Sequence, residues 1–307
     1  MITTNYQIEP ESFTDQQVDD SAREFPSTPD LIRSALRAQR EVSVQKGPRS
    51  CLTKLLNGTG SLVRSCDGRV TYQGLLRCTT QSCSFCRNII LSRHRDDLQE
   101  LLNIAAAGEL QILYVVNTMR MRADFDISEG IDTILKSLSL TYHHKFRKKF
   151  NCIARVTSLE IVYSDKTSRA WNLHSNSLLF FPRGVKLPRN FKGILFDRFI
   201  SRVQSIDKKR TPTYEGQYYK KLDREDYERI GNYITKSNSK WNISDEMTGA
   251  PYKRIGGLDL TDLVILASKK GGIYLRKYRE LAAGISGRRL FNKTRNIRQI
   301  LLNYLSE

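Results

Sequence analysis

Two extended runs separated by a short polar segment constrain the fold of this chain more than any other feature. Residues 154–163 and 171–181 are rich in β-branched and aromatic side chains, and a polar turn at 164–169 joins them. This pattern is typical of a β-hairpin, in which neighbouring strands run antiparallel. A further buried strand is expected over residues 110–117. Helical spacing of apolar residues recurs around these strands, at 98–105, 131–142, 191–203, 223–236, 259–267 and 274–282. The order predicts an α+β fold, with a central antiparallel sheet and helices on one face.

The charge of the chain indicates a polyanionic partner. The 307 residues include 50 Lys and Arg against 32 Asp and Glu, a net charge of +18. Residues 1–30 carry −6, from seven acids and one arginine, which leaves +24 for residues 31–307. Such an excess is typical of nucleic-acid binding, because phosphate contacts release counterions. The alternative is a solvated basic surface with no partner.

Neither a membrane span nor a secretory signal is expected. No apolar run approaches the ~20 residues that a spanning helix needs, and the N-terminus is polar and acidic without an apolar stretch. We therefore expect a cytoplasmic protein that does not bind membranes.

Composition divides the chain into four expected segments. Residues 1–30 lack periodicity and contain three prolines, so we expect a flexible acidic tail. Residues 31–108 form an N-terminal region with a Cys-rich module, and residues 109–240 hold the predicted sheet. Residues 241–307 are expected to be a basic helical region, since residues 268–307 alone carry ten Lys and Arg against two Glu.

Four cysteines in the N-terminal region have the residue type and spacing of a zinc site. They are Cys66, Cys78, Cys83 and Cys86. The last two form a Cys-x-x-Cys pair, and the four together provide a tetrahedral thiolate set for structural zinc in a ribbon-like module. A disulfide network is disfavoured in the cytosol. The alternative is that these cysteines are small buried hydrophobes.

The remaining candidates near this module have simpler interpretations. His94 is a possible substitute ligand for the zinc. Cys51 and Cys152 are expected to be ordinary core residues.

Three polar residues on the predicted hairpin form a second candidate metal site. His174 and Asn176 alternate along one strand and therefore share a face, and Glu160 lies on the neighbouring strand. A carboxylate, an imidazole and an amide oxygen suit a divalent ion. The pattern alone favours a hydrogen-bonded core histidine instead.

Tyr233 and Lys236 are a candidate nucleophile and its cationic neighbour. Positions i and i+3 of a helix are adjacent, so the ammonium can lie beside the phenol and favour its ionised, nucleophilic form. The alternative is a tyrosine at the rim of the core. The tyrosine-rich basic stretch 214–221, which includes Lys220 and Lys221, fits either base stacking or a sheet edge.

These motifs occur in an order that resembles a known family. The Cys-x-x-Cys ribbon is followed by a helix and a strand ending in Asn-Thr-Met-Arg at 117–120. The segments Leu-Glu-Ile-Val-Tyr at 159–163, Trp-Asn-Leu-His-Ser-Asn at 171–176 and Tyr-Ile-Thr-Lys at 233–236 come next. The chain closes with Tyr-Arg-Glu-Leu-Ala at 278–282 and Gly-Arg-Arg at 287–289. From about Cys66 to its end, the chain resembles the replication initiators of bacterial rolling-circle plasmids, members of the HUH endonuclease superfamily.

The resemblance implies a function and assigns roles to these residues. It implies an HUH/RRM-like palm over residues 109–240 that nicks and rejoins a single DNA strand at a plasmid origin. Tyr233 is the implied nucleophile, forming a 5′-phosphotyrosine with help from Lys236. Glu160, His174 and Asn176 are the implied ligands of Mg²⁺ or Mn²⁺. The implied partners are single-stranded or cruciform DNA and host replication proteins such as a helicase. The expected DNA contacts are Lys220, Lys221, Arg276, Lys277, Arg288 and Arg289.

The sequence departs from the family pattern at two places. The second metal-binding histidine is replaced by Asn176 and an earlier one by Asn172, and an amide oxygen is a weak ligand that favours harder ions. A glutamate that some relatives carry four residues before the nucleophile is replaced by Arg229, and Glu228 lies elsewhere on the helix. These departures keep two alternatives open: an inactive origin-binding protein or repressor, and a related relaxase or transposase. An RNA-binding zinc-ribbon protein is a third, but it leaves Glu160 and Tyr233 unused.

Overall fold

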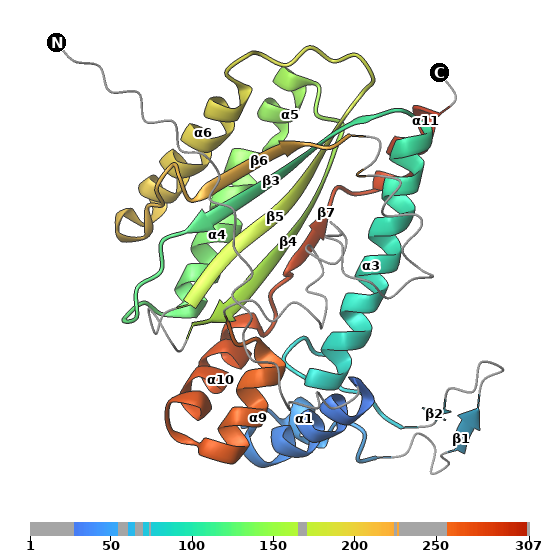
Figure 1. Cartoon of the computed structure of the whole chain (residues 1–307), viewed down its shortest axis with the longest axis vertical. Coiled ribbons are helices and arrows are strands. Elements are labelled where there is room, and N and C mark those ends of the chain that lie inside the picture. Colours follow the sequence, from blue (N-terminus) through green and yellow to red (C-terminus); the bar gives the residue numbers. More distant parts are fainter. Residues whose placement is uncertain are drawn as a thin grey trace, which may run out of the picture.

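A five-stranded antiparallel sheet forms the centre of the molecule (Figure 1). The computed structural model describes residues 28–54, 61–64, 70–73, 75–164, 171–223, 226 and 257–305. The sheet has the strand order β6-β3-β5-β4-β7. Its strands are β3 (Gln111–Met119), β4 (Ala154–Tyr163), β5 (Trp171–Phe181), β6 (Gln217–Lys221) and β7 (Phe291–Lys293). The predicted hairpin is confirmed, because β4 and β5 pair antiparallel with Glu160 opposite His174.

Helices precede, interrupt and follow the sheet strands. Those before and between the strands are α1 (Thr28–Val42), α2 (Lys46–Ser50), α3 (Ser84–Ala107), α4 (Ile127–Thr141), α5 (His144–Phe150) and α6 (Phe191–Ile206). The C-terminal ones are α9 (Leu260–Lys270), α10 (Gly272–Ile285) and α11 (Ile297–Asn303). A short 3-10 turn, η2 (Lys208–Arg210), follows α6, and a separate two-stranded ribbon pairs β1 (Ser61–Arg64) with β2 (Val70–Gln73). Helix α1 begins inside the segment that was expected to be a tail.

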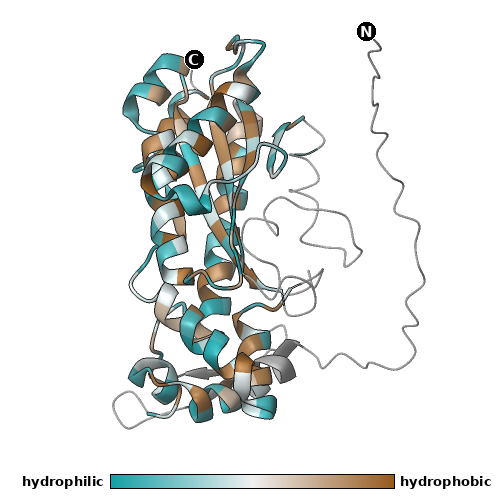
Figure 2. Ribbon diagram, turned by 90° about the vertical axis from the view of Figure 1, so that its left-hand side faces the viewer, coloured by the Kyte–Doolittle hydropathy of each residue, from teal (hydrophilic) through white to brown (hydrophobic). Residues whose placement is uncertain are grey.

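Helices cover both faces of the sheet, so the prediction of helices on one face is wrong. Leu173 and Leu179 of β5 belong to a large apolar core shared with α4, α5 and α6. Leu178 and Phe180 of the same strand point the other way, into a smaller core shared with α3 and α11. Because side chains alternate along a strand, a strand that is apolar on both faces must be covered on both. Figure 2 shows these apolar strands lying between helices whose outer faces are hydrophilic.

Helix α1 packs with α9 and α10 in one helical layer below the sheet, although these helices are far apart in sequence (Figure 1). Ala35, Ala38 and Val42 of α1 are buried in the same core as Leu263 and Val264 of α9. Helix α9 begins with a capping box, in which Asp259 and Asp262 each accept the backbone N–H of the other. In the described part of the chain, no helix is long and apolar enough to cross a bilayer.

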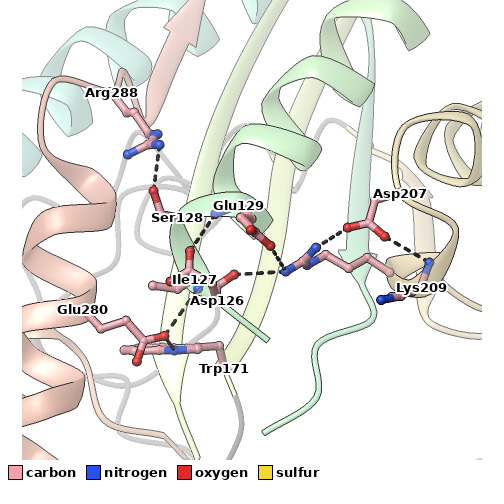
Figure 3. A network of polar contacts seen from close by, with 10 residues as sticks. Asp126, Ile127, Ser128, Glu129, Trp171, Asp207, Lys209, Glu280 and Arg288 are labelled. Carbon is pink, nitrogen blue, oxygen red and sulfur yellow. Dashed lines mark hydrogen bonds and ion pairs between the residues drawn. The ribbon is translucent and has the colours of Figure 1, made fainter. Parts of the chain in front are cut away.

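A polar network ties α10 to the sheet and to α4 (Figure 3). The carboxylate of Glu280 accepts the indole N–H of Trp171 at 2.8 Å and the backbone N–H of Ile127 at 3.4 Å. The ammonium of Lys277 donates to the same carboxylate at 2.8 Å. Farther along, Arg288 donates to both carboxylate oxygens of Asp132 at 2.7 and 2.6 Å. These contacts hold α4, β5 and α10 together, although the three elements are distant in sequence.

Candidate functional site

Four cysteine side chains converge where the N-terminal loops meet α3. The sulfur atoms of Cys51, Cys78, Cys83 and Cys86 all lie within 4.8 Å of one another. The sulfur of Cys86 lies 3.6 Å from that of Cys51 and 3.7 Å from that of Cys78. In a tetrahedral site with Zn–S bonds of ~2.3 Å, neighbouring sulfurs are ~3.8 Å apart. The cluster therefore has the ligands and the spacing to hold a structural metal such as zinc.

The start of α3 positions two of these ligands. Cys83 is the N-cap of the helix, where its sulfur accepts the backbone N–H of Cys86 at 3.5 Å. Cys86 lies in the first turn, so the unpaired N–H groups and the dipole of the helix stabilise thiolates at both positions. Cys51 comes from the end of α2, and Cys78 from the loop that precedes α3.

Gln39 of α1 supports the cluster from behind. Its side chain is fully buried, and its amide nitrogen contacts the sulfur of Cys83 at 3.5 Å and donates to the carbonyl of Pro48 at 2.7 Å. Its amide oxygen accepts the backbone N–H of Ser84 at 2.8 Å. Hydrogen bonds of this kind orient metal ligands and lower the charge on their sulfurs. One glutamine thus joins α1, the α2 segment and the start of α3.

The thiols of the cluster perturb one another strongly. Hydrogen bonding to Cys78 raises the pKa of Cys51, and hydrogen bonding to Cys51 lowers the pKa of Cys78. Hydrogen bonding to Cys51 also lowers the pKa of Cys83, to about 7. Four thiolates at this spacing repel one another. A bound divalent metal would neutralise their charge.

The cluster corrects part of the zinc prediction. Three of the four predicted ligands are present, but Cys51, which was expected to be an ordinary core residue, provides the fourth sulfur. Cys66 lies outside the described residues. His94 is not part of the cluster, because its ring stacks on Phe291 at 4.2 Å and burial lowers its pKa. Cys152 is buried apart from the cluster, as expected.

A polar patch lies at one end of the sheet face that α3 covers. His174 of β5 pairs with Glu160 of β4, with the ring Nε2 atom 2.9 Å from a carboxylate oxygen. Their side chains are 15% and 29% exposed, so the pair is accessible at its rim. Toward the other end of the same strand face, Asn176, Leu178 and Phe180 are fully buried. The sheet face therefore changes from apolar and covered to polar and open.

A hydrogen bond joins this pair. The 2.9 Å between the ring Nε2 atom of His174 and the carboxylate of Glu160 is an ordinary hydrogen-bond length. It fits the alternative interpretation of His174 as a hydrogen-bonded histidine. Asn176 shares their face, but its amide oxygen accepts the hydroxyl of Tyr114 at 2.8 Å. The third predicted ligand is thus already used in the fold.

Charged and aromatic groups surround the pair. Burial lowers the pKa of Arg87 in α3, and the negative charges of Asp259 and Glu160 partly offset this effect. Thr118 of β3 is opposite His174. Tyr218 of β6 is 50% exposed, and its ring meets Tyr114 edge-on at 6.1 Å. No short sequence motif predicts Arg87 or Tyr114 at this end of the sheet, because helix packing and strand pairing place them there.

The predicted DNA-contact residues fall into two groups. Lys221, Arg276 and Arg289 are exposed. The other three are engaged within the protein. Lys220 donates to Asp226 at 2.7 Å, and Arg288 binds Asp132. Lys277 is 9% exposed, pairs with Glu280 and lies 5.4 Å from the ring of Trp171. Its long side chain therefore stabilises the packing of α10 on the sheet.

The predicted nucleophile and its neighbour, Tyr233 and Lys236, lie outside the described residues, as do Arg229 and Glu228. Comparison of the chain with models of known protein families, with curated proteins and with solved structures found no match to any of them.

Proposed function

We propose that this chain is a metal-dependent DNA endonuclease and strand transferase that initiates rolling-circle replication, with Tyr233 as nucleophile. The observation that carries the proposal is the pair formed by Glu160 and His174. It joins two antiparallel strands by a 2.9 Å hydrogen bond, and both side chains are partly exposed at one end of the sheet face. The charge of +24 over residues 31–307 supports a polyanionic substrate.

The proposed reaction keeps the energy of the bond that it breaks. The phenol oxygen of Tyr233 attacks phosphorus, a tyrosine–phosphate ester forms, and the bond from phosphorus to the 3′ oxygen breaks. The departing 3′ oxygen takes a proton and becomes the primer end, so one phosphodiester replaces another. A divalent ion held by Glu160 and His174 would polarise the scissile phosphate. Lys236 would hold the same phosphate and favour the ionised phenol.

Residues around the pair suit a single-stranded substrate. Tyr218, on the edge strand β6 of the same sheet, is half exposed, and an unpaired base could stack on its ring. Arg87 offers a positive charge close to Glu160. A duplex keeps its bases stacked on one another, so this arrangement favours an unpaired or cruciform target step.

A cleavage assay tests the proposal. Zinc-loaded protein is incubated with the supercoiled replicon that carries its gene, in Mn²⁺ or Mg²⁺. We expect an open-circular product with protein attached to the 5′ end, absent with Tyr233→Phe and present with the matched variant Tyr304→Phe. Intact supercoiled DNA with every divalent ion, from a protein that still binds the plasmid, would count against the enzyme.

One observation favours a second candidate, an origin-binding protein without catalysis. Asn176 is fully buried, and its amide oxygen accepts the hydroxyl of Tyr114, so the family's second metal-binding histidine is replaced by a residue with a role in packing. This candidate predicts tight, salt-dependent origin binding that neither chelator nor Tyr233→Phe changes.

A further inference from the structure

The sheet face opposite the Glu160–His174 pair carries a separate basic surface on α5 and α6. Residues 133–159 contain six Lys and Arg and no acid. Within α5, Lys145, Lys148 and Lys149 are spaced i, i+3 and i+4, so they share one side of the helix, and all three are exposed. Phe146 and Phe150 occupy the other side and are buried in the large core.

Packing between aromatic rings brings α6 against this helix. The ring of Phe150 meets that of Phe191 edge-on at 5.0 Å, which joins the last turn of α5 to the first turn of α6. Lys149 lies 5.3 Å from the ring of Phe150, and Lys192 lies 5.7 Å from the ring of Phe196. Each of the two helices therefore holds one ammonium group over a ring of its own, Phe150 in α5 and Phe196 in α6.

Arg198 fixes the angle between the helices. Its guanidinium donates to the carbonyl of Thr141 at 2.7 Å, at the C-terminus of α4, and it contacts the ring nitrogen Nε2 of His143 at 2.9 Å. It also lies 5.6 Å from the ring of Phe146. The surface is thus rigid before any partner binds, which lowers the entropic cost of binding.

The cations of this surface form no hydrogen bond or ion pair within the described structure, and two of them lie over aromatic rings. We name it the α5–α6 basic surface, and its members are Lys145, Lys148, Lys149, Lys186, Arg189 and Lys192. All six are exposed, and none of their side chains has a hydrogen-bond or ion-pair partner in the described part of the chain. Helix α6 contains one acidic residue, Asp197. Such a one-signed surface attracts a polyanion.

We propose that the α5–α6 basic surface binds the phosphate backbone of duplex DNA, on the side of the protein opposite the proposed cleavage site. The proposal rests on the DNA substrate class of the proposed function and adds a second contact to it. Neither α5 nor α6 itself exposes a large apolar or aromatic side chain, and of the exposed ones nearby, Leu140 belongs to α4 and the ring of Tyr214 packs edge-on against Phe196. A membrane-surface helix needs apolar groups to insert, and a single-strand groove needs rings to stack bases. Cations alone suit a stacked duplex, which presents only its phosphates.

Neutralising the surface tests the proposal. In the full chain, Lys145→Gln, Lys148→Gln and Lys149→Gln are combined, and a matched triple variant changes Lys54, Lys269 and Lys270 to Gln. Binding to a 30-base-pair duplex of arbitrary sequence is measured by fluorescence anisotropy at several KCl concentrations. Each phosphate contact contributes about 0.9 to the salt slope and about fivefold to affinity at 0.15 M salt. The α5 variant should therefore lose up to about 2.7 from the slope and about 100-fold in affinity, and the matched variant much less.

Two further readings separate this surface from the cleavage site. Nicking of a short single-stranded origin oligonucleotide should be unchanged in the α5 variant, because the cleavage site is on the other face. Equal loss of duplex affinity in both triple variants would overturn the proposal, since bulk charge would then explain binding. Loss of binding to phosphatidylserine vesicles, with duplex binding retained, would also overturn it and assign the surface to lipid.

Discussion

The two candidate metal sites of this chain are built in opposite ways. The cysteine cluster draws four identical ligands from three separate segments and is backed by Gln39. The Glu160–His174 pair stands on two strands that hydrogen bonds already hold together, and the neighbouring Asn176 is bound by Tyr114. The cluster gathers thiols that a bound cation would hold together, whereas strand pairing alone holds the second pair. We therefore expect the first site to contribute to folding and the second to contribute little to it.

Removing a cysteine ligand should produce the largest change in the free energy of unfolding. A small change would contradict the difference drawn between the two sites. Cys83→Ser removes the thiolate that caps α3, so we expect loss of one equivalent of zinc and a fall of at least about 3 kcal/mol in the free energy of unfolding. Cys152→Ala is the matched control, a buried cysteine outside the cluster. Zinc content by elemental analysis and thermal unfolding measure both. A zinc-free Cys83→Ser protein as stable as the parent would contradict a folding role.

Substitution of the pair should separate activity from stability. Glu160→Gln and His174→Ala are expected to abolish nicking, by more than about 100-fold, because the scissile phosphate loses its metal. The free energy of unfolding should change by about 1 kcal/mol or less, since the pair is partly exposed. Urea denaturation and a single-turnover cleavage assay measure the two effects. Collapse of the fold in both variants would show that the pair is structural like the cysteines.

A substitution of Gln39 tests whether its hydrogen bonds support the cysteine cluster. Gln39→Ala leaves the backbone N–H of Ser84 without its buried partner and removes one of the donors to the sulfur of Cys83, so we expect a loss of about 2 kcal/mol and zinc release about tenfold faster. Gln99→Ala, at a partly exposed position of α3 away from the cluster, is the control. Transfer of zinc to a colorimetric chelator follows the release, and equal rates in the two variants would remove Gln39 from the site.

A substitution of Tyr114 tests whether Asn176 can act as a third ligand beside Glu160 and His174. Tyr114→Phe removes one donor from the amide oxygen of Asn176, at a cost of about 1 kcal/mol. If Asn176 acts as a third ligand, Mn²⁺ should bind several-fold more tightly, as read by electron paramagnetic resonance. Unchanged Mn²⁺ affinity would mean that Glu160 and His174 bind the ion without Asn176.

The smallest expected effect is a pH dependence from His94. Burial lowers its pKa, so the unfolded chain takes up the proton first as the pH falls below about 6.5, and stability is lost toward the lower pKa of the folded state. His94→Phe keeps the stack on Phe291 but cannot titrate. Its unfolding free energy should therefore fall less between pH 7 and pH 5 than that of the parent.

The sequence predicted the parts of the fold that depend on local pattern. Runs of β-branched and aromatic residues identified β4 and β5, and helical spacing identified α3, α4, α6, α9 and α10, because those signals lie within a few residues. The sequence missed α1, α11 and β7, and for β6 a sheet edge was one of the two interpretations of residues 214–221. It also assigned helices to one face, although Leu178 and Phe180 show that β5 is apolar on both.

The sequence predicted neighbouring site residues only where the pairing of two strands brings them together. The hairpin spacing placed Glu160 near His174, and the structure has them opposite each other. Cys51 lies 27 residues before Cys78, so no short motif connects it to the other three ligands. Arg87 and Gln39 reach their sites through the packing of α3 and α1, which no local pattern encodes.

Mapping the covalent adduct tests the central claim most directly. Zinc-loaded protein is mixed with Mn²⁺ and the replicon DNA, digested with nuclease and protease, and analysed by mass spectrometry. We expect a nucleotide joined through its 5′ phosphate to the peptide that contains Tyr233, and no such peptide from His174→Ala. An adduct on another residue, or an equal yield from His174→Ala, would contradict the assignment of the nucleophile and its metal site.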